Sequence, residues 1–551
     1  MLRRPFLFFL LLIISACSNV QTAQPTPTET FIPPSSSTPA ATGVPTGTVT
    51  PQPRLSPIVY GPEAEDFPSD INPLTGRAVE DASLLKLPAV LVSISNMPVT
   101  ARPQAGPGFA PWVYELFIGE GATRFLNVFY GEFPRAVPNV RGGCEVRKKI
   151  IQTDRAWIGN RVWLDENGRQ DAWEMGVGGV CVRLLDATSR EVIAETTTDS
   201  NGYYAFDYSG AEVIIQFLEP DAYQFTTADV GDDDRDSDAD VNGETRVVQT
   251  EEPASRFAWD AGLILTEQPI PTSSPVVTGT PPDLLNKPWF IPSEPYVGPI
   301  RSGRLTYNQI GGMFPNSCLV YASAAWDIGE MLDACEIVYG VDNTTPNSAL
   351  LPVTRLRELA EESLNPRQPV NYSGNLFSDT VPAGGRPANE IRVFYHSYTQ
   401  SAWRYDPVSQ SYLRWTDLAD GTGTLIPATD RLTDRQMAFE NVIVVFAEHH
   451  RFRHNQLEID FRLGQKNVAY IFRDGQVFKI FWSTENREWE KSTGLVRPMH
   501  FVDAQGNPVP LHRGRTWIHI VTPFSSVSDQ GNENWHVQFV QPYDPEDTPV
   551  P

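Results

Sequence analysis

The chain has 551 residues, enough for roughly three or four domains of about 100–200 residues each. Apolar residues make up 41%, which excludes wholesale disorder, while 48 prolines imply long unfolded connectors. Lys and Arg total 43 against 67 Asp and Glu, so the formal net charge is -24. A nucleic-acid partner would require a basic face. We therefore expect a modular, partly unstructured protein that does not bind nucleic acid.

Residues 1–17 read MLRRPFLFFLLLIISAC, the layout of a secretory signal, with two arginines, an apolar run and small residues before Cys17. The run is too short to span a bilayer, which takes about 20 apolar residues. Ile14-Ser15-Ala16-Cys17 resembles a bacterial lipobox, which implies that Cys17 is lipidated and begins the mature chain. The alternative is a cleaved signal with an incidental cysteine. We expect a protein anchored by lipid to the bacterial membrane and facing the extracytoplasmic side.

Two tracts rich in proline, serine and threonine divide the chain, one at residues 18–68 and one at residues 265–297. Their low charge and few large apolar side chains cannot bury enough surface to fold. The first tract is predicted to be a disordered stalk and the second a linker.

Four cysteines follow Cys17, and in an oxidising compartment they are candidates for pairing. The sequence does not determine the connectivity. Cys318 with Cys335 is the favoured pair, because it closes a short loop. Cys181 lies in an apolar, strand-like run and is alternatively a buried free thiol.

Residues 154–264 alternate apolar and polar side chains in short runs punctuated by Gly and Asp, which predicts antiparallel strands and a β-sandwich. The runs are 158–168, 179–186, 198–206 and 259–263. They resemble the B-type repeat of serine-aspartate-repeat surface adhesins, related to the collagen-adhesin B module. The resemblance implies a calcium-binding β-sandwich that serves as a stiff spacer.

Two acidic clusters in this segment are candidate calcium ligands, since calcium takes six to eight oxygen ligands. The first cluster is Asp165, Asn167, Asp171 and Glu174, and the second is Asp234, Asp236 and Asp238. In the first, Glu174 stands two residues short of the acidic position of the family's longer loop. The alternative is a solvated acidic surface.

Strands and one helix are predicted on both sides of the β-sandwich, in residues 69–130 and 298–524. Residues 351–364 read as a helix with Leu356, Leu359 and Ala360 on one face. Asp474-Gly475 between two apolar runs predicts a hairpin with a type I′ turn. The fold class is therefore multidomain, with a strand-rich α+β host domain. Residues 131–153 are taken as a connector and 525–551 as a C-terminal tail.

These flanking segments resemble the YerB-like family of bacterial lipoproteins, whose defining domain has no assigned function. The resemblance rests on 72–76, 101–106, 115, 123–129, 298–304, 394–395, 405–406, 412–414, 441–444 and 514–517. In that family the strand ending at Phe129 is closely followed by the segment that starts here at Gly298. The β-sandwich with its linkers is thus read as an insertion into a loop of one host domain.

Arginines in the resemblance motifs are candidates for an anion-binding cleft, because guanidinium groups bind carboxylates or phosphates with two parallel hydrogen bonds. They are Arg102, Arg124, Arg301 and Arg304. Glu115 is alternatively a general base among them or their counter-ion. The competing interpretation is that all five form structural ion pairs and turns. His450 and His454 lack the pattern of a metal site, and the aromatic residues 403–415 are more typical of packing than of sugar binding.

Two functions follow. The first is a noncatalytic binding or scaffold lipoprotein of the cell envelope, whose partners are the membrane and a cell-wall polymer or envelope protein. The alternative is an envelope enzyme that acts on cell-wall polymer through Glu115 and the arginines. We favour the first, because the sequence contains no recognisable nucleophile, metal triad or cofactor loop.

Overall fold

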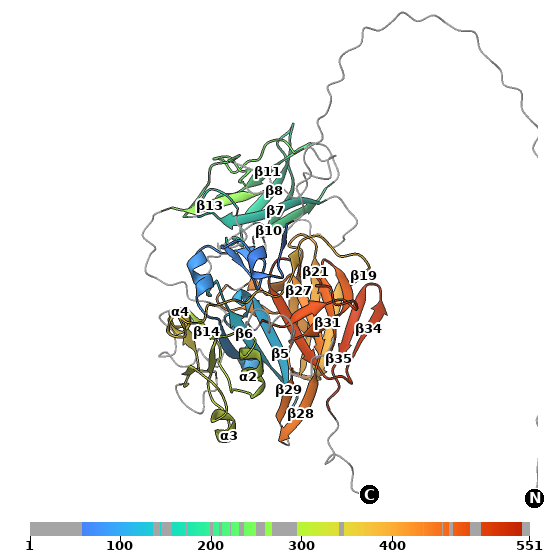
Figure 1. Ribbon diagram of the computed structural model, residues 1–551. Helices are drawn as coiled ribbons and strands as arrows, with labels where there is room; N and C mark the ends of the chain where they lie inside the picture. Colours follow the sequence, from blue (N-terminus) through green and yellow to red (C-terminus); the bar gives the residue numbers. More distant parts are fainter. Residues whose placement is uncertain are drawn as a thin grey trace, which may run out of the picture. The chain divides into compact units, whose positions relative to one another are not determined.

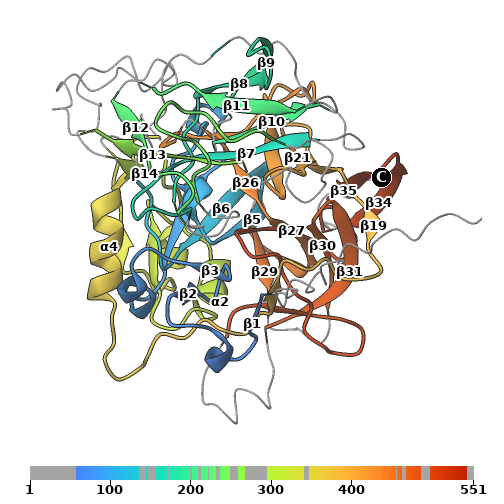
Figure 2. The same ribbon diagram turned by 90° about the horizontal axis from the view of Figure 1, so that it is seen from above.

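The protein is described by a computed structural model, shown in two views (Figures 1 and 2). The described residues are 58–135, 144, 157–170, 174–198, 202–208, 212–220, 222–230, 236–248, 259–266, 295–340, 347–433, 435–453, 456–461, 467–484 and 497–542. Cys17, Asp171, Asp234 and His454 lie outside them. Within these ranges, none of the helices has the length and apolar character needed to cross a membrane.

The inserted segment folds as two packed β-sheets, drawn in green shades in Figure 1. Its strands are β7 (Trp157–Leu164), β8 (Cys181–Asp186), β9 (Val192–Thr197), β10 (Tyr203–Asp207), β11 (Val213–Phe217), β12 (Tyr223–Phe225) and β13 (Ala261–Leu265). One sheet has the order β10-β7-β13-β12 and the other β11-β8-β9. Alternate side chains of both sheets, including Ile158, Val182 and Phe217, form a core of their own. The predicted β-sandwich is therefore confirmed.

One large sheet of 11 strands runs through both halves of the host domain. Its strands are β4 (Val90–Ser95), β5 (Trp112–Gly119), β6 (Ala122–Phe129), β15 (Cys318–Tyr321), β16 (Glu336–Ile337), β19 (Arg386–Pro387), β27 (Asn441–Phe446), β30 (Asn467–Arg473), β31 (Gln476–Ser483), β32 (His500–Val502) and β33 (Thr516–Val521). β15 lies parallel to β4, and β33 lies parallel to β5. The three strands from before the insert, β4, β6 and β5, are thus flanked on both sides by strands from after it, so the two halves form a single domain.

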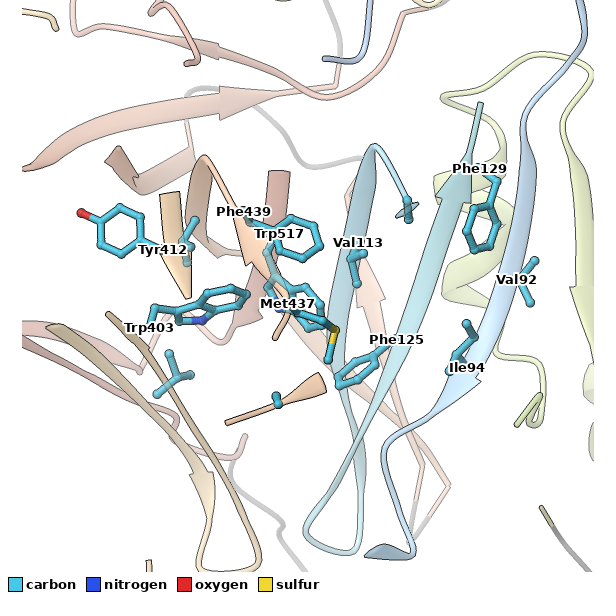
Figure 3. Packing of buried hydrophobic residues seen from close by; sticks show 14 of the residues in the cluster. Val92, Ile94, Val113, Phe125, Phe129, Trp403, Tyr412, Met437, Phe439 and Trp517 are labelled. Carbon is cyan, nitrogen blue, oxygen red and sulfur yellow. The ribbon is translucent and has the colours of Figure 1, made fainter. Parts of the chain in front are cut away.

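A second sheet of seven strands packs against one face of the large sheet. It contains β20 (Glu390–His396), β21 (Thr399–Asp406), β22 (Ser411–Asp417), β23 (Leu425–Pro427), β26 (Ala438–Phe439), β34 (Ser526–Gly531) and β35 (Asn534–Gln538). Figure 3 shows the layer between the sheets, where Trp403 and Phe439 meet Val113, Phe125 and Trp517. We call this buried layer the inner core.

The opposite face of the large sheet is covered by helix α2 (Thr306–Gly311) and by loops. Tyr307 and Ile310 of this helix pack there with Leu91, Leu126 and Ile518 of the sheet. We call this layer the outer core. Helix α4 (Val353–Glu362) adds Leu356, Leu359 and Ala360 to the inner core, the three residues predicted to share its buried face.

Shorter elements complete the host domain. They are α3 (Trp326–Gly329), β1 (Val59–Tyr60), β2 (Ile71–Asn72), β3 (Arg77–Ala78), β14 (Tyr296–Val297), β17 (Leu351–Pro352), β18 (Phe377–Ser378), β24 (Thr429–Asp430), β25 (Arg435–Gln436), β28 (Glu448–Arg453) and β29 (Gln456–Asp460). Single-turn 3-10 helices lie at Ala64–Asp66, Ala82–Lys86, Val99–Ala101 and Pro107–Phe109.

Three expected boundaries require correction. The stalk does not extend to residue 68, because β1 pairs with β18 and Phe67 packs on Phe377. The linker does not extend to residue 297, because β14 pairs with β17. Residues 525–551 are not simply a tail, because β35 pairs with β20 and places Trp535 and Val537 in the inner core. In each case backbone pairing and burial hold residues that composition assigned to a connector or tail.

Two disulfides join the four cysteines that follow Cys17. Cys318 and Cys335 are bonded in the host domain, with 5.3 Å between their Cα atoms. Cys144 is bonded to Cys181, with 5.0 Å between the Cα atoms. Cys181 is therefore a disulfide cysteine and not a buried free thiol, which corrects the alternative stated from the sequence.

Candidate functional site

The candidate residues of the host domain lie on two different faces of the sheet that contains β5 and β6. Side chains alternate between faces along a strand, and residues directly opposite each other share a face. Glu115 lies opposite Phe125, which belongs to the inner core, whereas Leu116 lies opposite Arg124. Leu116 belongs to the outer core. Glu115 and Arg124 are therefore on opposite faces of the sheet.

Glu115 is part of a buried polar network in the inner core and is 1% exposed. Its Oε1 accepts a hydrogen bond of 2.9 Å from Thr123 Oγ1, and its Oε2 accepts one of 3.1 Å from Trp517 Nε1. Arg414 Nη2 lies 3.5 Å from the same Oε2. The carboxylate is shielded from solvent and lies beside Arg414, so it serves as the internal counter-ion of Arg414. The alternative in which Glu115 is a general base among the arginines is contradicted by this placement.

His519 and Trp403 extend this network. Trp403 Nε1 donates to His519 Nε2 at 2.8 Å, so Nε2 must be the unprotonated nitrogen. The proton of the neutral ring is then on Nδ1, which lies 3.4 Å from Glu115 Oε2. Burial, with the positive charge of Arg414 beside it, holds the pKa of His519 well below its usual value. The neutral ring of His519 therefore accepts from Trp403, while its Nδ1 faces the carboxylate of Glu115 and the hydroxyl group of Tyr395.

Arg102 also lies on the inner-core side, apart from the other three candidate arginines. Its Nη1 forms an ion pair of 2.9 Å with Asp417 Oδ1, and its Nε donates to the backbone oxygen and Oδ1 of Asn96 at 3.0 Å. Asn96 in turn donates to Thr123, which holds Glu115. Arg102 therefore supports the buried network, and the expectation that it joins an anion-binding cleft needs correction.

Arg124, Arg301 and Arg304 are brought together on the outer-core side of the sheet, and we call them the arginine cluster. Arg124 of β6 lies opposite Ser95 of β4. The segment that carries Arg301 runs beside the same strand, because Arg301 N donates to Ser93 O at 2.9 Å. Arg301 Nε also donates to Ser95 Oγ at 3.2 Å. The cluster therefore joins the two halves of the host domain.

Several nitrogen atoms of the arginine cluster have no hydrogen-bond partner among the described residues. Arg124 is 6% exposed, and its Nε and Nη1 are buried without a hydrogen-bond partner. Arg304 Nη1 donates to Ser302 Oγ and Gly303 O at 3.0 Å, while its Nε is buried and unpaired. Among the described residues, no carboxylate lies within ion-pair distance of the three. Burial, with repulsion from Arg301 and Arg304, lowers the pKa of Arg124 to about 9.

The first acidic cluster of the insert lies in a loop whose backbone is hydrogen-bonded to the side chains of the cluster. Asp165 Oδ1 accepts hydrogen bonds from the backbone of Asn167 and Gly168 at 3.0 and 2.7 Å. Glu174 Oε1 accepts one of 2.9 Å from Glu166 N. Asp165 Oδ2 is buried and has no partner. An orphaned carboxylate oxygen of this kind fits a cation ligand.

The second acidic cluster contains a residue that the sequence analysis missed. Asp238 Oδ2 accepts a hydrogen bond of 2.7 Å from Asp260 N, and Asp238 Oδ1 is buried without a partner. Burial, with repulsion from Asp260 and Asp236, raises the pKa of Asp238 to about 8. Burial raises the pKa of Asp260 to about 7. Asp260 directly precedes strand β13. The only feature that marked it in the sequence was its position as an acidic residue at the end of a strand.

The buried carboxylate oxygens without a partner in both acidic clusters fit calcium ligands. One observation argues against a preformed calcium site. In the part of the chain that is described, the group whose ligand atoms all lie within 4.8 Å of one another is Cys144, Cys181 and Glu195. Its cysteines are bonded to each other, so it is not a metal site. Asp165, Asn167 and Glu174 would hold one ion, and Asp236, Asp238 and Asp260 another, after the carboxylates draw closer. A bound ion would add positive charge beside these carboxylates.

The remaining candidates have structural roles. His450 lies on β28, a strand paired with β29, so a helical pair of histidines does not form there. Trp403 and Tyr412 are buried in the inner core, and Arg404 stacks on Trp415 at 4.1 Å. These aromatic residues pack the domain, in line with the interpretation favoured from the sequence.

Comparison with protein families identifies three segments. Residues 74–160 match the N-terminal domain of the protein of unknown function DUF3048, and residues 391–518 match its C-terminal domain. Residues 156–263 match the SdrD B-like domain. The crystal structure of the YerB protein from Bacillus subtilis aligns with 82% of this chain and 96% of its own, at 16% identity and a TM-score of 0.42.

Two curated relatives each match a part of the chain about as long as the insert. A fibrinogen-binding protein of Staphylococcus epidermidis is 44% identical over 94 residues, or 16% of this chain and 8% of its own. Serine-aspartate repeat-containing protein C of Staphylococcus aureus strain Newman is 46% identical over 112 residues, or 20% and 11%. The chain thus spans about a tenth of the length of these relatives.

Proposed function

Because the chain carries the N- and C-terminal halves of DUF3048 with an SdrD B-like domain inserted between them, we propose that it is a noncatalytic surface lipoprotein of the cell envelope. The host domain acts as a binding or scaffold module. The SdrD B-like domain acts as a spacer that calcium stiffens. Its partners are the membrane, reached through the lipid on Cys17, and a cell-wall polymer or another envelope protein, but not nucleic acid.

The observation that carries this proposal is the inserted domain. Its relatives include proteins named for serine-aspartate repeats and for fibrinogen binding, which resemble surface adhesins. A domain of this type is of use outside the cell, where calcium is plentiful and disulfides persist. The Cys144–Cys181 bond at the edge of the insert supports the same location.

The geometry of Glu115 favours the binding function over the enzyme. An acid or base must reach the proton that it transfers, directly or through one water molecule. Glu115 is enclosed between the two sheets and faces away from Arg124. This placement of Glu115 supports the binding function and not the enzyme alternative that joined Glu115 to the arginines.

The location is tested by replacing the proposed lipid-bearing residue. Cys17→Ser should abolish lipidation and move the protein from the membrane fraction to the medium, or leave the signal segment uncleaved. If the signal segment is still cleaved, most of the membrane-bound protein should be lost, since a single lipid is the proposed anchor. Metabolic labelling with a fatty acid and membrane fractionation measure both effects. Ser35→Ala in the stalk is the matched control, and a wild-type chain that takes up no fatty acid would refute the anchor.

A further inference from the structure

Among the described residues, the arginine cluster has no carboxylate in an ion pair with it, in a protein whose net charge is -24. A buried guanidinium is normally paired, because an isolated buried charge is costly. Arg124 has two buried nitrogens without an acceptor, and Arg304 has one. Within the described ranges, Glu458 is an acidic residue that lies beside Tyr307 in this region. Its carboxylate is already bonded to the backbone of Leu305 and Thr306.

We propose that Arg124, Arg301 and Arg304 form a binding site for a phosphate group, which supplies the missing negative charge. This inference deepens the proposed binding function of the host domain, because it names the chemical class of the ligand. It does not depend on the lipid anchor or on calcium. The phosphate is the shared chemistry of two envelope sources, a wall polymer built on phosphate esters and a phospholipid headgroup.

The arrangement of donors favours phosphate over a carboxylate. The three arginines come from two places, since Arg124 is on β6 while Arg301 and Arg304 are in the loop before α2. The cluster therefore combines donors from a strand and from a loop. A carboxylate offers two oxygens in one plane, whereas a phosphate offers acceptor oxygens arranged tetrahedrally and carries up to two negative charges.

The site has a buried floor and a more accessible rim. Arg124 forms the floor, and Arg301 and Arg304 are only half buried. Hydroxyl groups line the floor, where Ser93 Oγ lies 3.1 Å from Tyr307 OH and donates to Ser302 O at 3.2 Å. Ser93 and Tyr307 are fully buried. A polymer or lipid would present its phosphate to the partly exposed Arg301 and Arg304, while its remainder stays outside.

Direct binding is the first test. The probe is inorganic phosphate, titrated by calorimetry into the mature chain from residue 17 to 551 that carries Cys17→Ser. Saturable binding is expected, and Arg301→Gln and Arg304→Gln should each weaken it by about tenfold or more, because each removes a charged donor. Arg357→Gln is the matched control, since Arg357 is exposed on α4 and paired with Glu361. Absence of phosphate binding, or equal binding by all variants, would overturn the proposal.

An independent test is whether replacing Arg124 raises or lowers the melting temperature. Arg124→Met removes a buried charge that has no partner and keeps an apolar stem of similar length. The melting temperature in phosphate-free buffer should therefore stay the same or rise, while phosphate no longer raises it. If Arg124 instead stabilised the fold, Arg124→Met would lower the melting temperature. A clear fall in the melting temperature of Arg124→Met, with the response to phosphate retained, would refute the site.

Competition distinguishes the two sources of phosphate. If soluble glycerol phosphate displaces inorganic phosphate, the site accepts a solute or wall-polymer phosphate. If only vesicles of phosphatidylglycerol displace inorganic phosphate, and vesicles of phosphatidylcholine do not, the site binds an anionic lipid headgroup. Both results support the proposal. Displacement by acetate at the same concentration as phosphate would contradict the assignment of phosphate. Failure of the Cys17 experiment would leave this result unaffected.

Discussion

Glu115→Gln is expected to lower the free energy of unfolding of the host domain by about 3–5 kcal/mol. The substitution keeps the size of the side chain but removes its charge. Arg414 then remains in the inner core, 1% exposed, without its counter-ion. Thr123 and Trp517 also lose a charged acceptor. Urea unfolding followed by tryptophan fluorescence measures the loss, because Trp403 and Trp517 lie in the network.

A double substitution separates the ion pair from general disruption of the core. Adding Arg414→Met to Glu115→Gln removes both charges, so the double variant should be more stable than the sum of the single effects by about 1–3 kcal/mol. Glu361→Gln is the control, since its ion pair with Arg357 is exposed and should contribute little. If Glu115→Gln unfolds like the wild type, Glu115 is not the internal counter-ion.

Calcium is expected to raise the melting temperature of the isolated insert by on the order of 10 °C or more. An ion that binds only the folded state stabilises it by RT ln(1 + [L]/Kd), which is about 2.7 kcal/mol at a hundredfold excess over Kd. The physical reason is the repulsion among Asp236, Asp238 and Asp260. Segment 144–264 is the suitable fragment, because it retains both partners of the Cys144–Cys181 bond.

The calcium response has three controls. Magnesium should do less, because it demands tighter octahedral geometry and loses water reluctantly. Asp238→Asn should abolish much of the response but not destabilise the calcium-free fragment, whereas exposed Glu219→Gln should change neither. The calcium-induced shift should grow between pH 6 and pH 8, because the raised pKa values of Asp238 and Asp260 let protons compete with the ion. Identical melting with calcium, magnesium and chelator would refute the assignment.

Several elements could be predicted from local sequence because one local signal determined them. Asp474 and Gly475 both have positive φ, at 52° and 65°, as the type I′ turn between β30 and β31 requires. The buried face of α4 follows from the spacing of Leu356, Leu359 and Ala360. The insert was recognisable for the same reason, since one face of each strand is apolar and the turns are marked by glycine and aspartate.

The site was harder to predict, because it depends on strand register and long-range pairing. Nearly every residue of β5 and β6 is buried, since both faces of the sheet are covered. Apolar alternation was therefore absent, and nothing local showed that Glu115 and Arg124 face opposite ways. The pairing of Cys144 with Cys181, and of β35 with β20, also links segments whose contact has no local signature.

The central claim is that one host domain is interrupted by an independent insert, and removal of the insert tests it most directly. Residues 136–294 are replaced in the mature chain by a Gly-Ser linker of about 12 residues, which spans on the order of 20 Å. The product should be soluble and monodisperse, and calorimetry should show one cooperative transition near that of the host domain in the intact chain. An insoluble product, or one without a cooperative transition, would contradict the account.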